Sequence, residues 1–164
     1  MATLAAGYGA GAAKIHQAIS EAGFDISEHD AGNLHRGFWQ LFKGVKSFAA
    51  ASAEAAKTRG LRVYNRFGQS AVVSSPHKAF NWMVQSSINP IIQYFSRELL
   101  AACPSAQFVT WIHDELIVEL PAEHVETLKS AHAAASTAVN DWLQFETLKM
   151  RFGLTVGGDL YDIK

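Results

Sequence analysis

The sequence predicts an α+β fold in which helices cover antiparallel strands. Two spacings support this prediction: apolar residues recur every three to four positions over the longer segments, and they alternate over the shorter ones. The chain has 164 residues, of which 49% are hydrophobic and 18% are charged. That composition fills the core of one ordinary domain and excludes intrinsic disorder as the main state.

The helices are predicted from their apolar faces and from residues that begin or end helices. They cover about residues 11–22, 28–58, 76–100 and 122–145. Ser27 followed by Asp30 is a weak capping box at the start of the second helix, and a break in that helix is expected near Gly37 or Gly44. Pro90 lies inside the third helix and is expected to kink it.

The strands are predicted to form two hairpins and one terminal strand. They cover about residues 61–63, 71–73, 108–112, 115–120 and 148–156. The run Asn65-Arg66-Phe67-Gly68 is typical of the turn in the first hairpin. His113 and Asp114 separate the two apolar runs of the second hairpin, which therefore carries charge at its tip.

Neither a membrane span nor a secretion signal is predicted. The alanine-rich stretch over residues 47–57 is interrupted by Ser52 and Glu54, whereas a span needs about 20 apolar residues. The first residues lack the basic start and the apolar run of a signal peptide. The single cysteine, Cys103, cannot form an internal disulfide and is expected to be a packing residue. We therefore expect a cytoplasmic protein.

Charge is divided unevenly along the chain, although the formal net charge is −1. Residues 36–78, here called the basic segment, contain eight basic residues and one acid, Glu54, and carry +7, which leaves −8 on the remainder. The basic residues are Arg36, Lys43, Lys46, Lys57, Arg59, Arg62, Arg66 and Lys78. Two interpretations stay open: a solvated face, or a surface that contacts the phosphates of a nucleic acid.

His113, Asp114 and Glu115 place an imidazole and two carboxylates inside the apolar stretch from Phe108 to Leu120. Burying an unpaired carboxylate is costly, so either this tip is a plain turn that faces water or its carboxylates bind a divalent cation. Mg²⁺ suits the second interpretation because it keeps several waters and takes one or two protein carboxylates together with phosphate oxygens. Phosphoryl transfer is the chemistry that such a site serves.

Two further polar patterns precede this tip. The run Gly7-Tyr8-Gly9-Ala10-Gly11 lacks the spacing of a dinucleotide or P-loop motif, which favours a flexible start of a helix, although Tyr8 could stack on a base. His77, Asn81 and Gln85 recur at helical spacing and form a polar stripe. The stripe is either the wet side of the helix or a set of side chains that contact the acceptors of a DNA minor groove.

Several segments resemble motifs of the family A (DNA polymerase I-like) DNA polymerases, in the form typical of phage replicative enzymes. Residues 111–118, Trp-Ile-His-Asp-Glu-Leu-Ile-Val, are similar to motif C. Residues 75–86 are similar to the loop and helix that precede motif C, and residues 7–15 are similar to the end of motif B. Residues 157–160 are similar to the C-terminal tail. The segments follow the order of the family, and the likeness spans essentially the whole chain.

The resemblance implies a role for each matching position. Asp114 and Glu115 would be the catalytic carboxylates and would hold Mg²⁺ in a two-ion site that this chain supplies only in part. The DNA-binding positions would be Tyr8, Gly9, Arg66, His77, Asn81, Gln85 and His113. Asn81 and Gln85 would monitor the minor groove near the growing end, and His113 would contact the primer strand.

The implied architecture is an incomplete polymerase domain formed by residues 1–164 as a single C-terminal segment. Residues 1–60 would be helices like those of the fingers, and residues 61–104 would be a basic extended loop and a long helix. Residues 105–164 would be a palm-type antiparallel sheet with the motif C hairpin, a helix and a terminal strand.

Parts of the family pattern have no counterpart in the sequence. The motif A aspartate, the thumb and the exonuclease domain are missing, and the lysine and arginine that hold the triphosphate lie upstream of Thr3-Leu4 in the family. A two-ion site normally needs carboxylates from both motifs, so we expect the chain to be inactive alone.

Three hypotheses follow from this comparison. In the first, the chain belongs to a divided template-directed DNA polymerase, which acts on primer-template DNA and a deoxynucleoside triphosphate after a second polypeptide supplies the thumb and motif A. Its compartment would be the host cytoplasm if the chain is encoded by a phage. In the second, the chain is a non-catalytic DNA-binding or replisome-regulatory module derived from a polymerase. In the third, it is a truncated fragment.

Overall fold

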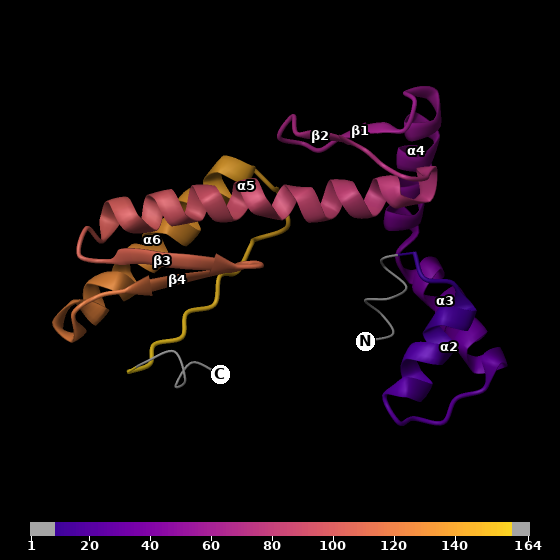
Figure 1. Cartoon of the computed structure of the whole chain (residues 1–164), viewed down its shortest axis with the longest axis horizontal. Helices are drawn as coiled ribbons and strands as arrows, with labels where there is room; N and C mark the ends of the chain where they lie inside the picture. Colours follow the sequence, from indigo (N-terminus) through magenta and orange to yellow (C-terminus); the bar gives the residue numbers. More distant parts are fainter. Residues whose placement is uncertain (1–8, 159–164) are drawn as a thin grey trace. The chain divides into compact units, whose positions relative to one another are not determined.

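The computed structural model describes residues 9–158 and divides into two compact units, Met1–Ser87 and Ile88–Lys164. Figure 1 shows helices together with two separate hairpins, and both hairpins are antiparallel. This arrangement confirms the predicted α+β class. Within the described range, no helix is both long enough and apolar enough to cross a membrane.

The first unit begins with a pair of helices, α2 (Ala12–Glu21) and α3 (Glu28–Leu41). Ile15 of α2 and Ala31 of α3 are buried against each other, with Ile19, Ile26 and Phe38 packed around them. The Ser27 hydroxyl accepts a hydrogen bond from the backbone N–H of Asp30 at 3.1 Å, which satisfies one of the free donors at the start of α3. The predicted cap is therefore confirmed.

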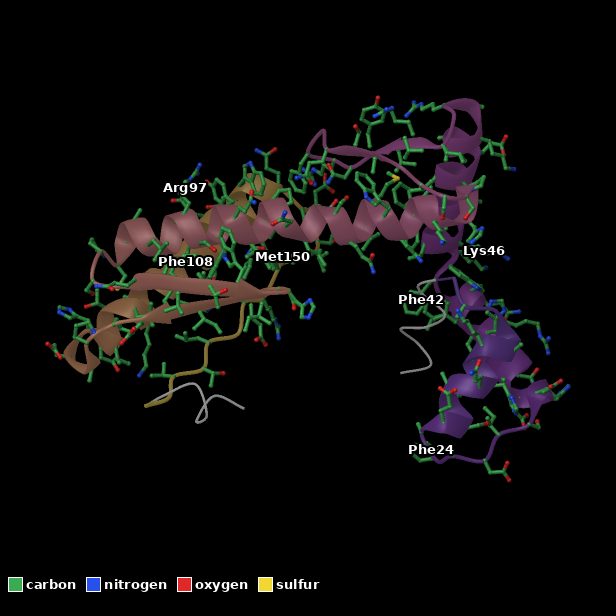
Figure 2. All side chains as sticks on the ribbon, in the orientation of Figure 1. Phe24, Phe42, Lys46, Arg97, Phe108 and Met150 are labelled. Carbon is green, nitrogen blue, oxygen red and sulfur yellow. The ribbon has the colours of Figure 1, made fainter. Side chains whose placement is uncertain are left out.

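The predicted helix over residues 28–58 is broken near Gly44, one of the two expected positions: α3 ends at Leu41 and α4 covers Lys43–Thr58. The break lies at Phe42, whose φ of −105° and ψ of 54° leave the helical region. Phe42 still contacts Phe38, with ring centroids 4.9 Å apart, so the apolar spacing continues across the break. This continuity explains why periodicity alone indicated one helix. Phe42 and Lys46 mark the start of α4 in Figure 2.

A short hairpin follows α4, formed by β1 (Arg62–Tyr64) and β2 (Ser70–Val72). Val63 of β1 is buried against Ala56 of α4, and Val73 and Ala79 complete this cluster. The buried Asn65 organises the turn. Its carboxamide oxygen accepts from the backbone N–H groups of Phe67 and Gln69, both at 3.0 Å. Its amide donates to the Ser86 hydroxyl at 3.0 Å, which attaches the hairpin to the next helix.

Pro76 begins the next helical segment as predicted, first as the 3₁₀ turn η1 (Pro76–Lys78) and then as α5 (Ala79–Ala102). The helix continues without interruption through Pro90 and crosses from the first unit into the second.

The second unit combines the end of α5 with a hairpin and a long helix. The hairpin strands are β3 (Gln107–Ile112) and β4 (Glu115–Glu119), and the helical segments are η2 (Ala122–His124) and α6 (Val125–Leu143). Its buried residues are Ile91, Phe95, Ser96, Leu99, Cys103, Ala106, Leu128, Ala131, Ala135, Val139 and Leu143. The Tyr94 ring of α5 stacks on Trp142 of α6 with centroids 4.6 Å apart, so the two helices pack together. Cys103 is buried, as expected of a packing residue.

The predicted strand over residues 148–156 is wrong, because this segment has neither helix nor strand geometry. Its backbone is fixed by a side chain instead of a neighbouring strand. The Met150 N–H donates to the Asn140 carboxamide oxygen at 2.7 Å, and the Asn140 amide donates to the Met150 carbonyl at 3.0 Å. Phe152 then stacks on Phe95 with centroids 4.3 Å apart. Of the alternating apolar residues, only Met150 and Phe152 are half-buried, whereas Leu148, Leu154 and Val156 stay exposed.

Replacing Ser27 with alanine should destabilise the α2–α3 pair. The substitution removes the acceptor for the Asp30 N–H, and loss of such a cap costs about 1 kcal/mol. Urea unfolding followed by circular dichroism measures the change. Ser47→Ala on the exposed side of α4 is the control and should change the free energy of unfolding by less than about 0.5 kcal/mol. Equal effects of the two substitutions would contradict the assigned cap.

Replacing Asn140 with alanine should release the segment around Met150. Both backbone groups of Met150 are then left without their partner, at a cost of about 1–3 kcal/mol. Amide hydrogen exchange should show faster exchange at Met150, and thermal unfolding should show a lower midpoint. Thr137→Ala, one helical turn away, removes only a hydroxyl that donates to the Ala133 carbonyl and serves as the control. Unchanged exchange at Met150 in Asn140→Ala would refute this role.

Candidate active site and nucleic-acid surface

The His113-Asp114-Glu115 triplet lies at the tip of the β3–β4 hairpin, as the sequence predicts. Ile112 pairs with Glu115, so the loop between the strands is only His113 and Asp114. His113 has a φ of +56°, which is the left-handed region that a two-residue hairpin loop requires. All three side chains are exposed.

The hairpin is attached to α5 through Trp111. Its indole N–H donates to the hydroxyl of the buried Ser96 at 3.3 Å, and the Ser96 hydroxyl donates to the Ile92 carbonyl at 2.8 Å. Leu116 lies opposite Trp111 and therefore shares its face of the hairpin. Ile112 and Glu115 share the other face. This pairing places the Glu115 side chain on the face of the hairpin opposite to Trp111.

Strand β3 leaves large apolar side chains open to solvent. Phe108, Val109, Trp111 and Ile112 are each between 46% and 48% exposed. A bulge at Val109 adds one residue to β3 between the pairs Phe108–Val118 and Thr110–Ile117. Phe108 is labelled on β3 in Figure 2, and its ring contacts Trp111 with centroids 4.9 Å apart. The strand thus offers apolar surface on both sides of the sheet.

The two carboxylates of the tip have the chemistry of a partial metal site. Neither Asp114 nor Glu115 forms an ion pair or a hydrogen bond with any residue of the described range. Hard carboxylate oxygens suit Mg²⁺, which also accepts water and phosphate oxygens as ligands. Within residues 9–158, no group of three or more His, Cys, Asp or Glu side chains is arranged to hold a metal ion. The tip can therefore supply two adjacent ligands and needs others.

The basic segment lies in the first unit and is exposed along most of its length. All eight basic residues are solvent-exposed. Lys57 forms an ion pair with Glu54 at 2.9 Å, and Arg62 donates to the Ser70 hydroxyl at 3.3 Å. Arg66 lies in the turn between Asn65 and Gly68, whose backbone is held by hydrogen bonds from the N–H groups of Phe67 and Gln69 to the Asn65 side chain. An exposed cation on a rigid turn suits contact with a phosphate.

The polar stripe follows η1 and the first turns of α5. His77 and Gln85 are exposed, and Asn81 is half-buried and has interactions within the chain. Asn81 and Gln85 are four residues apart on α5, so they share one helical face. The His77 Nε2 lies 3.4 Å from the Ser75 hydroxyl.

The sequence-predicted residues fall into two sets that the structure describes separately. His113, Asp114 and Glu115 are neighbours on the hairpin of the second unit, whereas Arg66, His77, Asn81 and Gln85 belong to the first. Gly9 is exposed with a φ of +80°, and Tyr8 lies outside the described residues. The tail-like residues 157–160 lie partly outside them.

Two supporting contacts of these sets were not foreseen from the sequence. Asn65 donates to Ser86, and Ser96 accepts from the Trp111 indole. The run from Asn65 to Gly68 located the turn itself but gave no signal for the contact with Ser86. A serine inside an apolar helix is a weak signal for the second, because serine often bonds only to its own helix.

Comparison with known proteins identifies the fold. No family model matches the chain, and no curated protein matches it. Among solved structures, the chain is similar to the POL domain of Pol1 from M. smegmatis in complex with DNA primer-template and dNTP, with a TM-score of 0.67 and 17% identity. The likeness covers 84% of this chain and 26% of that chain, so this chain spans about a quarter of the neighbour's length. The chain therefore has the fold of part of a DNA polymerase domain.

Proposed function

We propose that the chain is the C-terminal part or subunit of a template-directed DNA polymerase of family A, in the form typical of phages. One observation carries the proposal: two unpaired carboxylates stand at the tip of a hairpin in a chain whose fold matches part of a DNA polymerase domain over 84% of its length. In this proposal Asp114 and Glu115 are the motif C residues that bind metal.

The donor atoms at the tip fit Mg²⁺. The ions would neutralise charge on the reacting phosphates and activate the attacking primer oxygen. Asp114 supplies a carboxylate from the loop, and Glu115 supplies one from the first position of β4. His113 adds an imidazole next to them that can donate a hydrogen bond to the primer strand. Because the loop has only two residues, His113, Asp114 and Glu115 follow one another directly at the tip.

The first unit would hold the nucleic acid. Arg66 and the rest of the basic segment would contact phosphates of primer and template, which accounts for their exposure and for the scarcity of acids among them. His77, Asn81 and Gln85 would contact the minor groove, where carboxamides meet acceptors that every base pair presents. Tyr8 and Gly9 would lie beside the templating base.

A second polypeptide would supply the remaining metal ligands, the thumb and the triphosphate contacts. Two features support a partner. The tip supplies two metal ligands where a two-ion site needs more. The exposed apolar residues of β3 also favour contact with another protein surface.

Replacing Asp114 with asparagine should abolish primer extension by the assembled enzyme. The tagged chain is isolated from its native cells together with its partners, and extension of a primed template by deoxynucleoside triphosphates is measured. We expect a loss of about a hundredfold or more, because the substitution removes a charge that stabilises the transition state through the metal. Asp141→Asn on the exposed face of α6 is the matched control and should extend normally.

Two outcomes would contradict this function. Full extension by Asp114→Asn would refute the assignment of the metal ligand. Binding of primed DNA that is sensitive to salt, together with no extension by the wild-type complex, would instead favour the non-catalytic DNA-binding or regulatory module.

The isolated chain should bind a divalent cation only weakly. Mn²⁺ is used in place of Mg²⁺, and free Mn²⁺ is followed by electron paramagnetic resonance. Two carboxylates without a third protein ligand give an expected dissociation constant on the order of millimolar or weaker. Asp114→Asn combined with Glu115→Gln should remove this binding, whereas Glu123→Gln should leave it unchanged. Micromolar binding that survives the double substitution would place the metal elsewhere.

A further inference from the structure

A hollow lies between α4 and β1, beside two arginines of the basic segment, Arg59 and Arg62. Its volume is about 190 Å³, and the first turns of α5 contribute Met83 to its wall. All of its lining residues belong to the first unit. Helix α4 contributes Phe48, Ala51, Ser52, Ala55 and Ala56 to the lining.

The lining of this hollow is mostly apolar. Ala51, Ala55 and Val63 offer small side chains, and the hydroxyl of Ser52 is already used, since it donates to the Phe48 carbonyl at 2.7 Å. Phe48 and Tyr64 are 48% and 45% exposed and present aromatic rings to a guest. Such walls favour a planar apolar group that can stack on a ring.

The volume limits the guest to one ring system. A cavity of about 150 Å³ takes a benzene molecule, whereas pockets for drug-sized ligands begin at about 300 Å³. At about 190 Å³, the hollow suits a group the size of a single nucleobase or an aromatic side chain.

Two guanidinium groups distinguish between these guests. Arg59 and Arg62 both line the hollow, both are exposed, and neither forms an ion pair with a described residue. The hydrogen bond from Arg62 to the Ser70 hydroxyl leaves most of its donors free. The acid of the basic segment, Glu54, is already paired with Lys57. The planar forks of arginine match the oxygens of a phosphate.

We propose that this hollow binds an unpaired nucleobase of a single-stranded nucleic acid, with Arg59 and Arg62 on the flanking phosphates. A planar base joined to an anionic backbone fits both the apolar walls and the cationic rim. A duplex offers no unpaired base to the hollow, because its bases are stacked and paired. The inference goes beyond the proposed catalysis, since it uses neither the metal-binding tip nor a partner chain.

The test measures binding of the full chain to labelled oligonucleotides by fluorescence anisotropy, without divalent cation. The probes are an oligothymidylate of about ten nucleotides, in the range of known single-strand sites, and an abasic oligomer of the same length. Ala51→Leu fills the hollow, and Ala50→Leu places the same side chain on the neighbouring exposed position of α4, which does not line it. Circular dichroism checks that both variants keep their helices.

We expect Ala51→Leu to weaken oligothymidylate binding by about fivefold or more, because the base can no longer enter the hollow and stack there. Ala50→Leu should bind as the wild type does, and the abasic oligomer should bind all three proteins equally and more weakly. Arg59→Gln should make the salt dependence of binding weaker. The negative slope of log K against log salt should decrease in magnitude by about 0.7 for each phosphate that Arg59 neutralises in the wild-type complex.

Three results would overturn the inference. The first is equal affinity of the wild-type chain for the thymidylate and abasic oligomers. The second is equal binding of oligothymidylate by the two leucine variants. The third is displacement of oligothymidylate by an acidic tyrosine peptide, Glu-Glu-Tyr-Glu-Glu, at lower concentration than by unlabelled oligothymidylate, which would assign the hollow to an aromatic side chain of a protein.

Discussion

Burying two adjacent carboxylates is unfavourable unless a cation is buried with them. This electrostatic constraint determines where Asp114 and Glu115 lie in the second unit. A hairpin tip meets the constraint, because Asp114 lies in a loop of two residues and Glu115 begins β4, so both stay exposed. The apolar runs on either side then become the two strands. The same exposure leaves both carboxylates without a partner in the described chain, and hard carboxylate oxygens of this kind suit a divalent cation.

The tip is useful only if the hairpin is held firmly, and one buried hydroxyl contributes to this. Ser96 of α5 donates to its own helix and accepts from the Trp111 indole, so a polar contact links the strand to the helix inside an apolar region. The large apolar side chains of β3 are nevertheless nearly half exposed to solvent. A hairpin of two strands is marginal by itself, so packing on α5 and contact with further protein would both stabilise it.

Local chemistry made much of this fold predictable from the sequence. The Ser27 cap, the Pro76 helix start and the charged turn at His113 each depend on neighbours in sequence, and all three are confirmed. The failures depend on partners distant in sequence. Residues 148–156 alternate like a strand, but Asn140 takes the backbone groups of Met150 that a neighbouring strand would take. For the candidate site, the sequence located the tip, the basic segment and the turn at Asn65, while the contacts of Asn65 with Ser86 and of Ser96 with Trp111 needed the fold.

The two units differ in charge, and under the proposed function this difference gives a metal ion a role at the hairpin tip. The first 87 residues contain nine basic and five acidic residues, and the remainder contains five basic and ten acidic residues. Phosphates are therefore attracted to the first unit and repelled by the second. A divalent cation on Asp114 and Glu115 would neutralise their two negative charges and would offer its remaining coordination positions to phosphate oxygens. Under the proposed function, the tip would therefore repel the phosphates of DNA without the cation and would bind them once the cation is present, which would couple binding of the primer end to the ion that phosphoryl transfer requires.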